Sequence, residues 1–280
     1  MNIQWFPGHM TKAVRMMEEN AALCDVLIYV IDARAISSCK NPVLDKLMKN
    51  KPVLYVFNKC DLVEKSDIDK WCKVFDKEGK TYVRAIGTSG ECSQIVTAIK
   101  SLMRDVIERY KAKGVNKCLR AMVVGVPNSG KSTLINSMRK KASAKIGDRP
   151  GVTRGKQWLA LDDYIDLLDT PGTLWGRFEN QKVAKHLAYI GSIRDDILDI
   201  VELSVEFISE LAENYLEKII ERYGISELTN NPTEILSQIA QSRGYKLRGD
   251  EVDLERCAKA VIDDFRKGKL GKIMLEKAVI

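Results

Sequence analysis

The sequence predicts an α/β domain with a mostly parallel sheet and helices on both faces, followed by a small all-helical domain. Four continuous apolar runs end in polar residues, as buried parallel strands do. These runs cover residues 25–34, 52–61, 82–89 and 119–127. Helical patterns separate them, which is typical of a doubly wound sheet. The strand signals stop near residue 180, so we expect one domain at 1–180 and a second at 181–280.

The same patterns predict the other elements in order along the chain. Helices are expected at 10–23, 42–49, 66–77 and 93–112. Two more strands, at 157–161 and 164–169, should pair with each other because Asp162 and Asp163 mark a turn between them. In the second domain, helices are expected at 194–222, 232–242 and 251–267, where Gly224, Pro232 and Gly244 break the pattern.

The composition is that of a folded globular protein. The chain has 280 residues, 45% hydrophobic and 30% charged, so it can bury a core without a disulfide or a metal. Its seven cysteines form no C-x-x-C pair, which argues against zinc and favours a reducing cytosol. No apolar run reaches the roughly 18 residues of a membrane span, and the N-terminus has no signal-peptide pattern. We therefore expect a cytoplasmic protein that contacts no membrane.

Positive charge is concentrated in the first domain. Residues 1–180 carry 30 Lys and Arg against 20 Asp and Glu, whereas residues 181–280 carry 15 against 18. The densest basic stretch is 139–156, which would attract a polyanion such as RNA through counterion release. A solvated face combined with phosphate-binding residues would explain this stretch equally well.

Residues 125–132 match the phosphate-loop pattern G-x-x-x-x-G-K-[ST], between an apolar strand and a helix. In such a loop the backbone amides and the helix N-terminus bind phosphates. Lys131 would neutralise β- and γ-phosphate oxygens, and Ser132 would ligate Mg²⁺. The loop residues predicted to bind nucleotide are Val126, Pro127, Asn128, Ser129, Gly130, Lys131, Ser132 and Thr133.

The tetrapeptide N-K-x-D at 58–61 closes the second strand and predicts recognition of guanine. Asp61 can accept hydrogen bonds from guanine N1–H and N2–H₂, which adenine cannot supply in that arrangement. Asn58 would tie this loop to its neighbours, and the stem of Lys59 would lie along the base. Backbone contacts to guanine O6 are expected from the residues after the third strand, Thr88, Ser89 and Gly90.

Two further segments resemble the nucleotide-sensing switches of GTPases. Asp169 to Gly172 match D-x-x-G at a strand end, so Asp169 would hold Mg²⁺ through water and the Gly172 amide would bind the γ-phosphate. Thr153, between the phosphate loop and D-x-x-G, is the candidate for the second protein ligand of Mg²⁺. Such segments become ordered with the triphosphate and relax after hydrolysis.

The order of these motifs is a circular permutation, because the base-reading motifs come before the phosphate loop and the switches. The site survives such a rearrangement, since all its loops follow the carboxyl ends of parallel strands and domain termini are often close together. The chain therefore resembles the ribosome biogenesis GTPase A family of circularly permuted P-loop GTPases. The opening W-F-P-G-H-M at 5–10 and the late D-F-R-K-G-K-L-G at 264–271 carry the same resemblance.

The resemblance implies a GTP-binding and GTP-hydrolysing factor for late assembly of the large ribosomal subunit, with Mg²⁺ as cofactor. The expected partners are GTP or GDP, rRNA and ribosomal proteins, and we expect a monomer. Because D-x-x-G leads directly into the helical domain, the nucleotide state could reorient that domain. RNA contact by the acidic second domain would need a local patch, for which the candidates are Arg266, Lys267, Lys269 and Lys272.

Two other functions remain open from the sequence. A P-loop ATPase or kinase would explain the phosphate loop, but N-K-x-D argues against it. A GTPase acting on tRNA or at a membrane would share every nucleotide motif. Asn128 is at the loop position that coordinates a monovalent cation in families with this kind of P-loop, so K⁺ is a possible second cofactor, or Asn128 only shapes the turn.

The group that orients the attacking water is not obvious, because Thr173 and Leu174 stand where the usual catalytic Gln would follow Gly172. His9 is the candidate, since a neutral imidazole in a mobile opening segment could polarise water. It would be held in place by the ribosomal subunit, so hydrolysis should be slow without it. The alternative for His9 is a helix-entry or RNA-contacting role, and His186 is expected to be structural. The predicted catalytic residues are His9, Lys131, Thr153 and Gly172.

Overall fold

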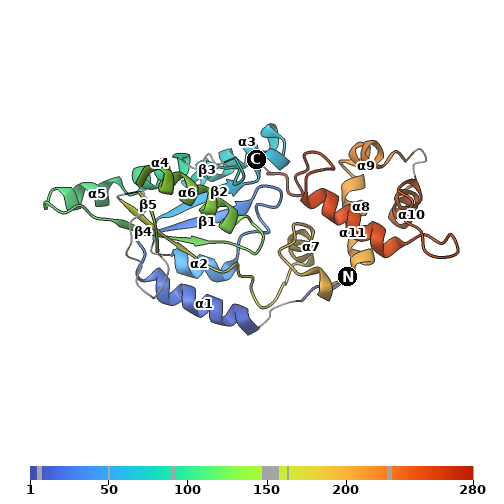
Figure 1. The fold of residues 1–280 in the computed structure, drawn as a ribbon, viewed down its shortest axis with the longest axis horizontal. Helices are drawn as coiled ribbons and strands as arrows, with labels where there is room; N and C mark the ends of the chain where they lie inside the picture. Colours follow the sequence, from blue (N-terminus) through green and yellow to red (C-terminus); the bar gives the residue numbers. More distant parts are fainter. Residues whose placement is uncertain are drawn as a thin grey trace. The chain divides into compact units, whose positions relative to one another are not determined.

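The computed structural model describes residues 1–4, 8–49, 51–89, 93–146, 158–162, 164–225 and 229–279, with the side chains of His9, 140–146 and 162 outside the description. The chain forms two compact units (Figure 1). The sheet unit contains Trp5–Arg177 and Met274–Ile280, and the helical unit contains Met1–Gln4 and Phe178–Ile273. The expected division at 180 differs from this one at both termini, where short end segments join the opposite unit.

The sheet has six strands in the spatial order β3-β2-β1-β4-β6-β5. All neighbours are parallel except β5 and β6, which form the predicted antiparallel pair. The strands are β1 (Val26–Asp32), β2 (Val53–Asn58), β3 (Thr81–Arg84), β4 (Leu119–Val124), β5 (Trp158–Asp162) and β6 (Ile165–Asp169). The mostly parallel sheet is confirmed, with the phosphate-loop strand β4 in its interior.

The third strand is shorter than predicted because the chain leaves the sheet after Arg84. Ala85 still donates its N–H to Phe57 O at 2.7 Å, but Gly87 N donates to the Asn58 side chain instead of to a strand. The residues after Ala85 therefore form a turn against the end of β2. The apolar run at 82–89 did not reveal this, since hydropathy does not show whether a backbone N–H bonds to a neighbouring strand or to a side chain.

Helices cover both faces of the sheet, as predicted. They are α1 (Gly8–Ala21), α2 (Pro42–Met48), α3 (Lys65–Lys77), α4 (Ser93–Leu102), α5 (Arg104–Lys111) and α6 (Lys131–Ile146), with a 3₁₀ turn at Cys60–Leu62. In Figure 1, α4 and α6 lie above the sheet, α1 and α2 lie below it, and α5 extends beyond its end. The predicted helix at 93–112 is two helices, because the chain breaks at Met103.

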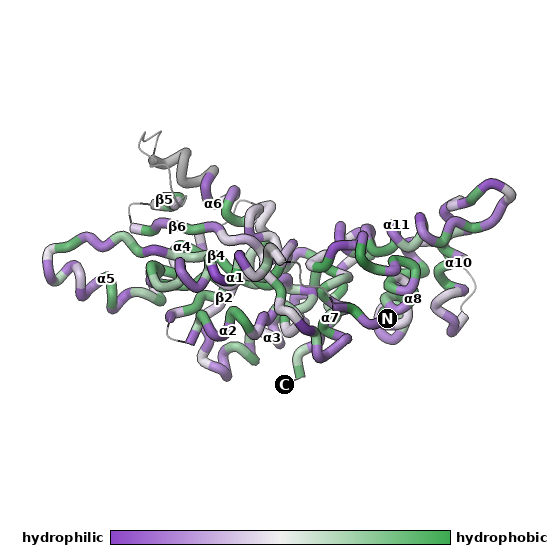
Figure 2. Tube along the Cα trace, turned by 90° about the horizontal axis from the view of Figure 1, so that it is seen from below, coloured by the Kyte–Doolittle hydropathy of each residue, from purple (hydrophilic) through white to green (hydrophobic). Residues whose placement is uncertain are grey.

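The two faces of the sheet bury different side chains. On one face, aliphatic residues of the strands pack against α4 and α6 through Ile95, Ile99 and Leu134. On the other face, the ring of Phe75 on α3 contacts Tyr55 and Phe57, with ring centroids 5.1 and 4.8 Å apart. Figure 2 shows hydrophobic residues along the central strands of this unit. This double burial explains why the strands are continuous apolar runs.

The helical unit contains more and shorter helices than predicted. They are α7 (Gln181–Tyr189), α8 (Ile200–Ala212), α9 (Leu216–Tyr223), α10 (Pro232–Ser242) and α11 (Leu254–Arg266), with a 3₁₀ turn at Asp195–Ile197. The single helix expected at 194–222 is wrong. Asp199 begins α8 by accepting hydrogen bonds from the backbone N–H groups of Val201 and Glu202, and the chain turns again before Leu216.

Each terminus is held by side-chain hydrogen bonds. At the start, Ile3 N donates to Gln181 Oε1 at 2.7 Å within the helical unit. At the end, the carboxylate of Glu276 accepts from Ser37 N at 2.6 Å and from Ser38 N at 3.1 Å within the sheet unit. Trp71 Nε1 donates to Glu276 O at 2.8 Å. We call residues 274–279 the terminal strap, which fixes the turn after β1.

Among the described residues, no helix has both the length and the apolar character needed to cross a membrane.

Candidate nucleotide-binding site

The predicted motifs lie at one edge of the sheet. N-K-x-D follows β2, the phosphate loop follows β4 and D-x-x-G follows β6, and these three strands run parallel with β1 among them. Since carboxyl ends of parallel strands meet at one edge, loops distant in the sequence are neighbours here. The edge therefore brings together what the sequence separates.

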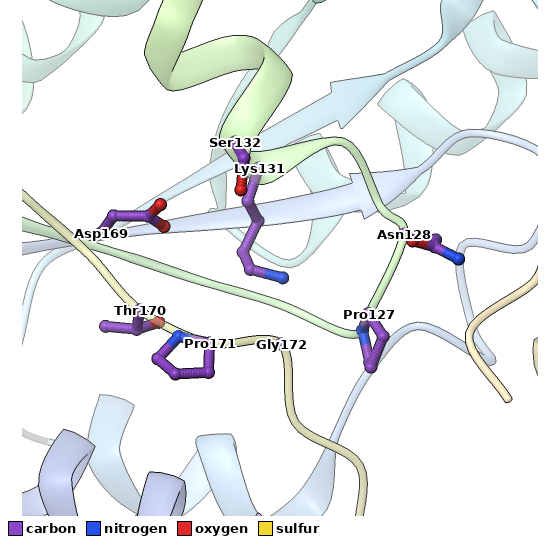
Figure 3. Close-up of a pocket in the computed structure, with 8 residues that line it drawn as sticks. All are labelled: Pro127, Asn128, Lys131, Ser132, Asp169, Thr170, Pro171 and Gly172. Atoms are coloured by element: carbon purple, nitrogen blue, oxygen red, sulfur yellow. The ribbon is translucent and has the colours of Figure 1, made fainter. Parts of the chain in front are cut away.

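A cavity of about 480 Å³ lies between the phosphate loop and the D-x-x-G segment. Its lining residues are Pro127, Asn128, Lys131, Ser132, Asp169, Thr170, Pro171 and Gly172 (Figure 3). In Figure 3 the Asp169 carboxylate and the Ser132 hydroxyl project toward the same space, with Lys131 beside them. A cation, two oxygen donors and a helix N-terminus share one cavity, which is suited to a phosphate and a hard metal ion.

The phosphate loop depends on its two glycines. Gly125 has a φ of 150°, and a Cβ there would lie 2.4 Å from Val30 O. Gly130 has a φ of 93°, and its Cβ would lie 2.2 Å from Asn58 Nδ2. Any side chain at these positions would push the loop away from β1 or from the base-reading loop. The glycines therefore allow a close approach as well as an unusual backbone.

Lys131 is buried at the centre of the phosphate loop, with 6% of its surface exposed. Its Nζ donates to Val126 O at 2.9 Å and to Gly125 O at 3.2 Å. Burial lowers the pKa of Lys131 to about 8, against the opposing charge of Asp169. An ammonium held by neutral carbonyls in a desolvated site would bind an anionic phosphate more strongly than those carbonyls.

The D-x-x-G segment lies directly against the phosphate loop. A Cβ on Gly172 would be 2.6 Å from Pro127 Cα and 2.8 Å from Lys131 Nζ, so only glycine fits. Thr173 N donates to Gly125 O at 3.3 Å. Burial raises the pKa of Asp169, although nearby Lys131 acts in the opposite direction. A partly desolvated carboxylate beside a hydroxyl supplies the oxygen ligands that Mg²⁺ prefers.

Asn58 connects the base-reading loop to two other segments. Its Nδ2 donates to Ser129 O at 2.9 Å, and its Oδ1 accepts from Gly87 N at 2.9 Å. Lys59 Nζ donates to Asn128 O at 2.7 Å. The expected tie between this loop and its neighbours is therefore present, and it runs to the phosphate loop and to the turn after β3.

The described residues predicted to contact the base are exposed. Asp61 lies in the 3₁₀ turn after Lys59, and Thr88 and Ser89 lie in the turn after β3. The two turns face the same edge of the sheet because Asn58 connects them. Their exposure leaves the Asp61 carboxylate accessible to a ligand.

Sequence reasoning missed a buried ion cluster beneath Lys59. Asp32, at the end of β1, is fully buried, and its Oδ2 lies 2.8 Å from both Lys59 Nζ and Arg34 Nη2. Burial would raise the pKa of Asp32, but Arg34 and Lys59 hold it well below its usual range. The signal was available, since the first strand ends in Asp-Ala-Arg at the same edge as the recognised motifs.

Other predicted residues are not brought into the cavity or lie outside the described part of the chain. Thr153 and Gly90 lie outside it, and His9 begins the first turn of α1 with its side chain not described. Thr133 is exposed on α6, and Val126 is buried below the loop.

His186 has the structural role expected of it. Only 1% of its surface is exposed, and its Nε2 lies 2.7 Å from Glu210 Oε1 within the helical unit. Arg266, expected to contact RNA, is instead used within the same unit. It donates to Ala188 O and Tyr189 O, which end α7, and pairs with Asp195 at 2.7 Å. The guanidinium of Arg266 therefore caps the carboxyl end of α7.

The neighbours of Arg266 are paired as well. Lys267 lies 2.8 Å from Asp263, and Lys269 lies 3.3 Å from the partly buried Asp264. Asp264 also accepts from Arg222 at 2.9 Å. The late motif at 264–271 therefore joins α11 to α7 and α9, while the side chains of Lys267 and Lys269 stay 60% and 49% exposed beside their acidic partners.

Comparison with known proteins agrees with the geometry. Ribosome biogenesis GTPase A of Bacillus licheniformis is 39% identical over 279 residues, which is 99% of each chain. This chain belongs to the ribosome biogenesis GTPase A family. Residues 120–237 also match the family model described as 50S ribosome-binding GTPase.

Solved structures agree with this assignment. GNP-bound YlqF from T. maritima is 25% identical, with a TM-score of 0.67 over 95% of this chain and 98% of that one. The GDP-bound form has a TM-score of 0.66. The chain is therefore a GTPase with a circularly permuted P-loop fold.

The buried cluster predicts a positioning role for Asp32. Asp32→Asn leaves Arg34 and Lys59 without a counter-charge, so GDP affinity should fall by about tenfold or more, since hydrogen bonds to charged groups contribute about 1.5–3 kcal/mol. Fluorescence titration of Asp32→Asn, Lys59→Met and the double variant would measure the coupling. Because its pKa is held well below the usual range, Asp32 stays ionised from about pH 6 to 9, and the loss of GDP affinity should be the same across that interval. Additive losses would contradict this role.

Exposure of Asp61 at the base-reading loop predicts a change of base preference. Asp61→Asn should lower GDP affinity by about a hundredfold or more and create affinity for xanthosine diphosphate, because the amide complements a carbonyl at the former N2 position. Glu64→Gln, an exposed acid at the start of α3, is the matched control and should bind GDP normally. If Asp61→Asn binds GDP as tightly as the wild type, Asp61 does not contact the base.

Proposed function

We propose that this protein is a GTP-hydrolysing assembly factor for the large ribosomal subunit, acting in the cytoplasm as a monomer. The observation that carries the nucleotide part is the Asn58 side chain, which unites the base-reading loop, the phosphate loop and the turn after β3. The ribosomal part is supported by full-length relatives named ribosome biogenesis GTPase A.

In this proposal different residues of the cavity bind the phosphates and the metal ion. Lys131 contacts the β- and γ-phosphate oxygens, and the Gly172 amide lies against the γ-phosphate. Ser132 and Asp169 hold Mg²⁺, with Thr153 as a further ligand, and the metal would neutralise phosphate charge. Binding of the γ-phosphate at Gly172 would displace a segment that contacts Gly125 and leads into the helical unit, so nucleotide state would be passed to that unit.

The same observation weighs against the alternatives. In an ATPase or kinase, nothing would require an N-K-x-D loop hydrogen-bonded to the phosphate loop through both Asn58 and Lys59. A GTPase acting on tRNA or a membrane would share this geometry, and is disfavoured only by the names of the full-length relatives.

Nucleotide-dependent co-sedimentation with purified large ribosomal subunits tests the proposal. The wild-type protein should pellet with subunits in a non-hydrolysable GTP analogue and less with GDP. Lys131→Ala should lose this nucleotide dependence, because it loses the phosphate contact. A wild-type protein that pellets with tRNA or vesicles and not with subunits, in either nucleotide, would disprove the ribosomal function.

We also propose that Asn128 contributes to a K⁺ site beside the phosphates. Asn128 has a φ of 57°, lies at the rim of the cavity and points away from Lys131 in Figure 3. Hydrolysis should be faster in K⁺ than in Na⁺ at equal ionic strength. Asn128→Gly is the informative variant, because glycine keeps the left-handed turn and removes only the amide. If K⁺ preference persists in Asn128→Gly, or is absent from the wild type, Asn128 only shapes the turn.

We propose His9 as the group that positions water, in a state ordered by the subunit. His9→Ala should keep its GDP affinity and lose about a hundredfold of the subunit-stimulated rate, within the range of general acid–base catalysis. His9→Gln should recover part of it, since an amide also orients water. Normal stimulated hydrolysis by His9→Ala would shift the role to an RNA or protein group of the subunit.

A further inference from the structure

A basic projection lies at the end of the sheet unit opposite the nucleotide site. It consists of α5 and the segment that leads into β4, residues 104–118, which we call the basic arm. In Figures 1 and 2 the arm extends away from the sheet. It enters β4 at the amino end, whereas the phosphate loop leaves at the carboxyl end. Six residues of strand separate the two, which is about 20 Å.

The arm carries accessible positive charge. Residues 109–118 contain four basic residues and no acidic one. Arg109, Lys111 and Lys113 are exposed, and none of them forms an ion pair with any residue in the described parts of the chain. By contrast, the basic residues near the end of α11 are paired with Asp263, Asp264 and Asp195. The arm is therefore a place where cations remain available to a partner.

The arm has a defined shape although it contributes little to the core. No residue of α5 is fully buried, and only Val106 and Ile107 pack partly against the core. The helix ends in a hydrogen-bonded turn, in which Val115 N donates to Tyr110 O at 3.0 Å and Gly114 adopts a φ of 72°. An ordered turn presents its lysines at fixed positions without the entropy cost of a flexible tail.

The base of the arm is fixed to the sheet. Lys117 pairs with Asp25 at 2.8 Å, and its Nζ lies 5.0 Å from the centre of the Tyr110 ring. Lys117 therefore stabilises the arm, and the exposed cations beyond it are not needed for that purpose. Basic residues in a last helical turn also interact favourably with the helix dipole, but this effect is small at an exposed site.

We propose that the basic arm binds the phosphate backbone of RNA on the large ribosomal subunit, independently of the bound nucleotide. This inference rests on the proposed function for the class of partner. The four basic residues within 109–118, a stretch with no acidic residue, match a polyphosphate backbone, and binding releases condensed counterions. Because the site and the arm lie at opposite ends of β4, RNA on the arm leaves the nucleotide cavity open.

The test compares two triple variants of the full chain. The arm variant is Arg109→Gln with Lys111→Gln and Lys113→Gln, and the control is Lys70→Gln with Lys73→Gln and Lys77→Gln, which removes equal charge from exposed positions on α3. The probe is a 20-base-pair RNA duplex, titrated from 50 to 300 mM KCl. The arm variant should lose at least tenfold in affinity, and its plot of log K against log [salt] should be shallower by about two to three. The control should match the wild type.

Other measurements separate RNA binding from a structural role. Both variants should keep the wild-type melting temperature, GDP affinity and basal GTPase rate. RNA affinity and salt slope that are equal in the arm variant and the wild type would overturn the inference. So would arm-dependent binding to vesicles of equal phosphatidylglycerol and phosphatidylcholine without RNA binding. Arm-dependent RNA binding by a protein that never pellets with large subunits would support the arm and disprove the proposed function.

Discussion

The hydrogen bonds of one amide, that of Asn58, hold together loops that the chain makes far apart. Its nitrogen donates to Ser129 O and its oxygen accepts from Gly87 N, so the amide spans two loops. Gly130 has to be glycine for the amide to come this close. Without this contact, base recognition and phosphate recognition would be two weak sites on separate loops. With it, the energy of binding one half of the nucleotide aligns the other half.

A site of this kind depends on the spatial order of the strands and not on their order along the chain. The phosphate-loop strand β4 comes fourth in sequence, yet it lies between β1 and β6 in the sheet. The buried charge of Asp32 adds a second link at the same edge, because it orients Lys59 toward the phosphate loop. The chain can therefore begin and end elsewhere while the loops keep their neighbours. In the permuted chain, the basic arm is the connection between the base-reading half and the phosphate-binding half.

Much of the fold and site could be predicted because their signals are local. Buried strands are apolar runs, and nucleotide loops have fixed spacings of glycine, lysine and acid. The missed features depend on partners distant in sequence. The apolar pattern continues without a break along the helix expected at 194–222, but Asp199 caps a new helix within it. Arg266 looked available for RNA because its partner Asp195 lies far away in the sequence. Asp32 looked like the polar end of a strand until Lys59 and Arg34 were found around it.

The terminal strap makes the sheet unit discontinuous along the chain. Ser37, Ser38 and Trp71 obtain a hydrogen-bond partner from Glu276, which lies more than 200 residues later in the chain. The helical unit in turn needs the first residues of the chain, since Ile3 bonds to Gln181. Each unit is therefore built from two separate stretches of the chain, and a gene segment that encodes only residues 5–177 or only residues 178–273 omits part of a unit.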